Sequence, residues 1–154
     1  MSLLFNGSKT ATIAGTVLQC VEIYTGEGYT FPLSFKNSAG DAVDITDWTL
    51  STSVKYYTAN IAYPTATSSD DIVLSNVTLI TAPTPATVTT GITSGPLGTA
   101  WMFIPTTING GVTIGLDAAP ATMCIVTLSI SRTDDISGST DVNKEPIGLI
   151  IRYI

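Results

Sequence analysis

The chain contains 154 residues, of which 44% are hydrophobic and only 12% are charged, about half the charged share of an average soluble protein. The formal net charge is −6, histidine is absent, and the six Lys and Arg residues occur singly along the sequence. Nucleic-acid binding is not expected, because it needs clustered basic residues. The absence of histidine excludes every catalytic triad or relay that uses imidazole as its base.

Thr and Ser occupy many positions where Lys and Glu are usual, so the surface is expected to be rich in hydroxyl groups. Because β-branched side chains suit a pleated sheet, this composition favours an all-β fold. A sparsely charged surface is buried at a low desolvation cost, which predicts stable assembly into an oligomer.

The apolar stretches are shorter than a membrane span, and the N-terminus lacks the order of a signal peptide. We therefore expect a soluble product made and kept in a cytoplasm, with no membrane contact. Cys20 and Cys124 lie in apolar runs and are predicted to be reduced, buried thiols, with a disulfide as the alternative. No metal site is predicted, because neither cysteine has a second one nearby in the sequence.

Residues 1–12 are predicted to form an N-terminal arm, and residues 13–154 a single domain. The arm carries a short apolar cluster, which consists of Leu3, Leu4 and Phe5. An Asn-Gly turn signal follows this cluster, and we expect the cluster to dock on a neighbouring subunit. Residues 13–24 are rich in β-forming side chains and predict one strand or two short ones.

Residues 28–48 predict two strands joined by turns. Apolar side chains occupy every second position of the first strand, at Tyr29, Phe31, Leu33 and Phe35. This alternation is typical of a half-buried strand. Pro32 lies on the opposite face and has no N–H group, so the strand is expected at a sheet edge or with this position turned outward. Turn residues fill 37–41 and 44–47, and a second alternating strand begins at Trp48.

The rest of the chain predicts strands separated by loops. Residues 57–71 form a polar loop, where Tyr57 and Tyr63 are candidate exposed contact residues. Strands, single or paired, are predicted at 72–81, 101–104, 122–131 and 146–154, with a short strand or helical turn within 86–99 and a polar hairpin loop at 132–141. The run 122–131 starts with apolar residues on both faces, which predicts a central strand.

Together these elements predict an all-β protein, an immunoglobulin-like β-sandwich of roughly seven to nine short antiparallel strands. A jelly roll or a small barrel has a similar strand count and stays open as an alternative.

Carboxylates offer the main candidates for chemistry, at Asp41, Asp44, Asp47 and the pairs Asp70–Asp71 and Asp134–Asp135. Such clusters suit calcium, but Asp in turns commonly bonds its own backbone, and we assign these residues turn and capping roles. No phosphate-binding loop is present. Aromatic residues such as Trp48 and Trp101 are candidates for a sugar-binding face, although Trp48 is expected to pack in the core. No catalytic, cofactor-binding or metal residues are predicted, and the chain is not expected to be an enzyme.

The segment GYTFPLSF at 28–35, with the turn at 37–40 and VDITDW at 43–48, resembles the N-terminal β-hairpin of small bacteriophage virion proteins. This group includes the anchoring domain of baseplate upper proteins and other head or tail accessory proteins with immunoglobulin-like folds. The resemblance implies a subunit that decorates or connects parts of a phage particle, assembled in the cytoplasm of the bacterial host. It carries no functional residue over, because such proteins act through surfaces.

The function expected from residues and resemblance is a virion structural protein that docks onto tail, baseplate or capsid subunits. A tail or baseplate connector, or a fibre anchor, is preferred over a capsid decoration protein. The contact residues predicted for docking are Leu3, Leu4, Phe5, Pro32, Tyr57 and Tyr63. A third reading is a host-surface carbohydrate-binding or adhesion module that uses loops 57–71 and 132–141.

Overall fold

The computed structural model describes residues 2–4, 9–13, 15–59, 71–74, 77–114, 121–133 and 136–152. These residues form strands and no helix, which confirms the all-β prediction. The eleven strands are β1 (Ser2–Leu4), β2 (Lys9–Ile13), β3 (Thr16–Tyr24), β4 (Tyr29–Lys36), β5 (Thr49–Ala59), β6 (Asp71–Leu74), β7 (Val77–Ile80), β8 (Thr89–Ser94), β9 (Thr99–Ile104), β10 (Ala121–Thr133) and β11 (Thr140–Arg152).

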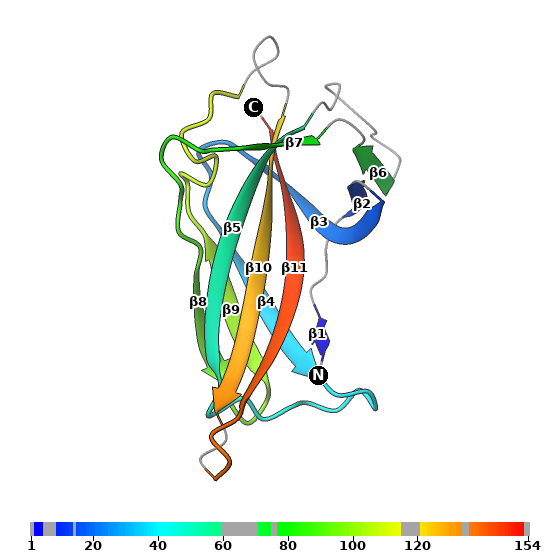
Figure 1. Cartoon of the computed structure of the whole chain (residues 1–154), viewed down its shortest axis with the longest axis vertical. Helices are drawn as coiled ribbons and strands as arrows, with labels where there is room; N and C mark the ends of the chain where they lie inside the picture. The colour runs from blue at the N-terminus through cyan, green and yellow to red at the C-terminus, as the bar shows by residue number, and fades with distance from the viewer. Residues whose placement is uncertain are drawn as a thin grey trace.

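The strands form two sheets, one with the order β1-β4-β9-β8 and one with the order β6-β2-β3-β11-β10-β5-β7 (Figure 1). Eleven strands exceed the expected seven to nine, because the 13–24 region is split at Gly15 and the predicted arm supplies β1 and part of β2. Most neighbours are antiparallel as predicted, but β3 pairs parallel with β11 and β2 pairs parallel with β6. The mixed sheet does not by itself define an immunoglobulin-like strand order.

The main core lies between the two sheets and is built by the period-2 alternation of their strands. In the four-stranded sheet, Leu33 and Phe35 of β4 and Met102 and Ile104 of β9 are fully buried. The facing side chains of the other sheet come from β10 and β11, namely Cys124, Val126, Leu128, Ile130, Ile147, Leu149 and Ile151. Arg132 closes one end of this core, with its guanidinium 4.9 Å from the centre of the Trp48 ring.

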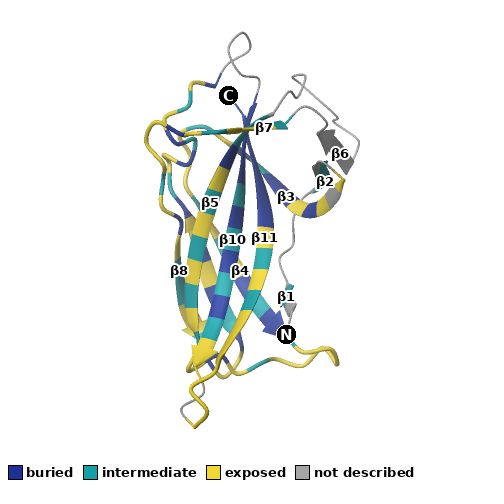
Figure 2. Cartoon of the chain, viewed as in Figure 1, coloured by how far each residue is buried: buried dark blue, intermediate teal, exposed yellow. Residues whose placement is uncertain are grey.

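A second core lies on the other face of the seven-stranded sheet and consists of Ala11, Leu18, Cys20, Ala121, Met123 and Ile150. It explains why the first residues of β10 and the last of β11 are buried on both faces, whereas burial alternates farther along each strand (Figure 2). The prediction of a central strand at 122–131 is confirmed. The ion pair of Glu22 with Arg152, whose Oε1 and Nε atoms are 2.7 Å apart, ties β3 to β11 beside this core.

Candidate interaction surfaces

The predicted contact residues do not gather on one surface. Leu3 is half-buried and packs against the main core, while Pro32 is exposed on the outer face of β4. Tyr57 is half-buried against the second core, on the far side of the other sheet. Phe5 and Tyr63, like the side chain of Leu4, lie outside the described residues, as does most of the 57–71 loop.

One side of the sandwich is left open where β3 turns away from β11. β3 pairs with β11 only from Cys20 to Tyr24, whereas Thr16–Cys20 pair with β2 along the other edge of β3. On that side, Thr140–Ile147 of β11 have no strand partner among the described residues. Opposite them, β1 pairs with Ser34–Lys36 of β4, and the earlier residues of β4 have no partner on that side in the part of the chain that the structure describes. We call this region, with the two uncovered strand edges, the open side.

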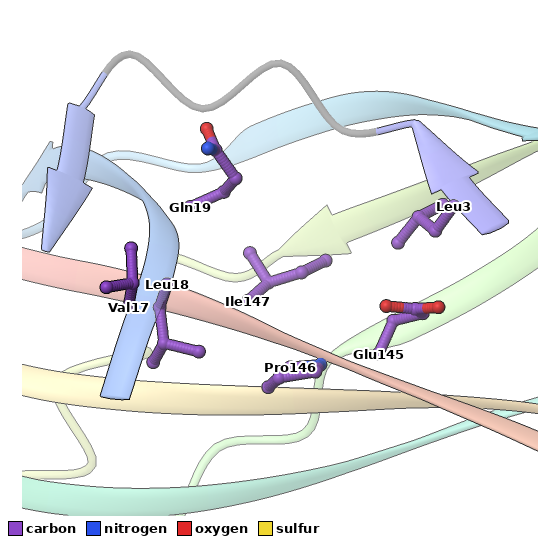
Figure 3. A pocket seen from close by; sticks show the side chains of 7 residues that line it. All are labelled: Leu3, Val17, Leu18, Gln19, Glu145, Pro146 and Ile147. Atoms are coloured by element: carbon purple, nitrogen blue, oxygen red, sulfur yellow. The ribbon is translucent and has the colours of Figure 1, made fainter. Parts of the chain in front are cut away.

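A cavity of about 220 Å³ lies on the open side, between β1, β3 and β11 (Figure 3). Its lining consists of Leu3, Val17, Leu18, Gln19, Glu145, Pro146 and Ile147. Leu18 and Ile147 are buried, whereas 64% of Val17 is exposed at the rim. Glu145 accepts a hydrogen bond from the side-chain amide of Asn143. The cavity therefore combines aliphatic walls with one carboxylate and one amide.

Two prolines remove hydrogen-bond donors from the strand edges of the open side. The carbonyl of Arg152 accepts a hydrogen bond from the N–H of Thr25, so it points toward β3. Backbone N–H and C=O groups alternate between the two edges of a strand. Pro146 is an even number of residues from Arg152, so its nitrogen points toward the β3 side as well. The N–H of Phe35 donates to the carbonyl of Gly98, so it points toward β9. Pro32 is an odd number of residues from Phe35, so its nitrogen points to the opposite edge of β4, on the open side. Proline at exposed edges prevents uncontrolled strand pairing. Pro32 was expected at a sheet edge or turned outward; β4 lies between β1 and β9, but Pro32 is beyond the residues that pair with β1 and is exposed.

A second surface, which the sequence analysis did not single out, is the outer face of the four-stranded sheet. Trp101 and Phe103 of β9 alternate with the buried Met102 and Ile104 and are 36% and 38% exposed. The strand register places Pro32 and Gly91 beside Trp101, and Thr30 and Thr89 beside Phe103, with Ser34 and Thr99 in the next row. We call these eight residues the aromatic face. Trp101 was among the aromatic residues considered for a sugar-binding face, and the alternation within WMFI was the signal that Phe103 shares its face.

Glycines allow the two rings to lie close to neighbouring backbone. A Cβ added at Gly91 would lie 2.5 Å from Cε2 of Trp101, so the indole crosses the position where any other residue would carry its side chain. A Cβ at Gly28 would contact the ring of Phe103 at 3.6 Å. Packing an aromatic ring over an edge-strand glycine shields the backbone there.

The acidic residues in the 37–48 segment have turn roles where their contacts are described. The Asp44 carboxylate accepts from the N–H and hydroxyl groups of Thr46, and these hydrogen bonds lower the pKa of Asp44. The turn role predicted for Asp44 is confirmed. Within the described ranges, no group of three His, Cys, Asp or Glu residues is placed to hold a metal ion. Asp70, Asp134 and Asp135 lie outside those ranges.

Both cysteines are free and buried, which confirms the prediction of reduced thiols. Burial raises the pKa of Cys20 to about 11 and raises that of Cys124 still further. The thiols are therefore neutral at ordinary pH and have low nucleophilic reactivity.

Comparison of the sequence with protein-family models and with curated proteins finds no match. The described part of the chain also contains no helix that is long and apolar enough to cross a membrane. What the fold and these surfaces define is a class, a two-sheet β protein with one open side and one uncharged aromatic face.

Proposed function

We propose that this protein is a structural subunit of a bacteriophage particle that docks onto other particle subunits, as a tail or baseplate connector or a fibre anchor. The observation that carries the proposal is the cavity on the open side, with the exposed Val17 at its rim and Leu3, a predicted contact residue, in its wall.

The cavity suits side-chain insertion by a partner rather than strand addition. Pro32 and Pro146 each lack the N–H group that an added strand would need at its edge. A cavity of about 220 Å³ is large enough for one long side chain of a partner. Aliphatic walls would pack along the stem of such a side chain, and Glu145 would pair with a terminal cation, as in the partly buried Lys and Arg residues of interfaces.

The sparse charge of the chain supports fixed contact with neighbours, because few charged groups have to lose water when a surface is covered. The segment that resembles phage virion proteins corresponds to β4 and the turns that follow it, and ends at the residue before β5. A capsid decoration protein is the alternative location, since the same docking mechanism would serve on the head.

The test compares two side chains of equal exposure. Val17 at the cavity rim and Leu79 in β7 are each 64% exposed, so replacing either with Asp should have little effect on folding. We expect Val17→Asp to lower the number of copies per particle about tenfold or more, measured by quantitative mass spectrometry of purified particles. Leu79→Asp should leave it unchanged. Equal incorporation of both variants, or absence of the wild-type protein from particles, would contradict the proposal.

Host-surface adhesion is the second candidate function. The sequence analysis based it on the 57–71 and 132–141 loops with Tyr57 and Tyr63, but Tyr57 packs against the second core. The exposed rings of Trp101 and Phe103 are the observation that favours a ligand-binding role at a different place.

A further inference from the structure

We propose that the aromatic face is a binding site for a neutral oligosaccharide. The site lies on the outer face of the four-stranded sheet, whereas the docking function was assigned to the open side. The inference therefore goes beyond the assembly role and does not depend on it.

The aromatic rings and hydroxyl groups of the aromatic face suit the surface of a sugar ring. Trp101 and Phe103 are two residues apart on β9, so their Cα atoms lie about 7 Å apart and their side chains leave the same face of the strand. The faces of aromatic rings carry partial negative charge and attract the C–H groups of a sugar ring. Hydroxyl groups of Thr30 and Thr89 flank Phe103 in the register, where they can exchange hydrogen bonds with sugar hydroxyls.

The lack of charge on the aromatic face favours a neutral ligand. None of the eight residues of the aromatic face is charged, although the chain as a whole carries a net charge of −6. Lys36, on the same face of β4, stands beyond the Ser34 row. A ligand with carboxylate or phosphate groups would find no cation among the aromatic-face residues, whereas a neutral ligand loses nothing by their absence.

The small area of the aromatic face favours a small ligand over a protein. Three strands about 4.8 Å apart, each contributing about five residues at about 3.3 Å per residue, present about 240 Å². A stable protein interface needs about 800 Å² from each partner. The face is too small to hold a second copy of this chain by itself, but it matches an oligosaccharide of a few residues.

Shielding of Gly91 accounts for one side of the Trp101 ring but not for the pair of rings. Phe103 lies beside Gly28, just before β4, and has Thr89 as its register partner in β8, yet it is still 38% exposed. A second exposed aromatic residue among hydroxyl groups is what a stacking surface for consecutive sugar units requires.

The experiment uses the full chain and three neutral probes, the hexasaccharides of cellulose, starch and chitin. Binding is measured by titration calorimetry and by tryptophan fluorescence in a Trp48→Phe background, so that the signal comes from Trp101. We expect at least one probe to bind and to change the emission of Trp101. Phe103→Ala and Thr30→Asp should each weaken that binding about tenfold or more. Leu79→Ala, on another surface, should leave it unchanged.

Trp101→Ala is not the main variant, because loss of the ring exposes the backbone at Gly91 and can impair folding. The proposal is overturned if the wild-type chain binds none of the three probes, or if Phe103→Ala and Thr30→Asp bind as tightly as the wild type. It is also overturned if the wild type forms a dimer that Thr30→Asp dissociates, since the face would then be a protein interface. Loss of particle incorporation in Val17→Asp bears only on the docking function, so the two proposals fail separately.

Discussion

Gly98, in the turn between β8 and β9, shows how one residue position can be fixed by its neighbours. Its φ is +65°, and a Cβ there would lie 2.5 Å from the carbonyl oxygen of Val43 and 2.9 Å from that of Phe35. The N–H of Phe35 donates to the carbonyl of Gly98 at 2.8 Å. Only glycine combines this conformation with such close backbone contact.

We predict that Gly98→Ala lowers the free energy of unfolding by about 2 to 4 kcal/mol, because left-handed strain adds to a clash with rigid backbone. The control is Gly138→Ala. Gly138 has a φ of +70° but nothing within 4 Å of the added Cβ, so its cost should be about 1 kcal/mol from strain alone. Urea denaturation of both variants measures the difference. Equal losses would show that the loop around Gly98 relaxes freely.

At the residue scale, sequence reasoning worked where the chemistry is local. Pro32 was expected at an edge or turned outward because a missing N–H is a property of the residue itself, and Asp44 was assigned to a turn because its side chain bonds nearby backbone. It failed for Tyr57, which was expected on an exposed loop. β5 continues to Ala59 and carries Tyr57 against the second core, a contact made with residues far away in the chain.

At the element scale, β4 and β11 are each only partly paired on the open side within the described residues, and a proline in the unpaired part of each strand limits further pairing. Pro146 stands two residues before Gly148, where pairing of β11 with β3 begins. Its missing N–H interrupts the row of donors on the uncovered part of β11, which otherwise presents a template for another chain.

We predict that Pro146→Thr increases self-association of the isolated protein, because threonine restores an N–H group on an uncovered strand edge. Sedimentation velocity over a range of concentrations measures the effect relative to the wild type. Pro85→Thr is the control, since Pro85 lies outside the strands. If Pro146→Thr sediments as the wild type does, the proline does not protect this edge.

At the scale of the whole molecule, the two buried thiols link stability to pH. Cys124 lies in the main core and Cys20 in the second core, on opposite faces of the seven-stranded sheet. Burial raises both pKa values above the ordinary value of 9.0. The unfolded chain therefore ionises its thiols at a lower pH than the folded chain does, and releases protons that the folded chain still holds.

Below about pH 9 the thiols are protonated in both the folded and the unfolded chain, so they do not change the free energy of unfolding with pH. As the pH rises from about 9 toward the Cys20 pKa of about 11, the free energy of unfolding should fall. Urea denaturation at a series of pH values measures the slope. The slope should be smaller, though not zero, in the variant Cys20→Ala/Cys124→Ala, because burial also raises the pKa of Tyr56. An unchanged slope in that variant would contradict the assignment to the thiols.

The sequence by itself determined the kind of secondary structure and the presence of strands in most of the described regions. Alternation of apolar side chains, hydroxyl-rich composition and Gly, Pro and Asn turns act within a few residues, so they can be read without knowing the rest of the chain. The tertiary structure alone decided which strands pair, which edges stay uncovered and which face of β9 meets solvent. The partners β3 and β11 include Glu22 and Arg152, which are 130 positions apart. A pairing over that distance depends on how the whole chain buries its apolar surface, and no local pattern records it.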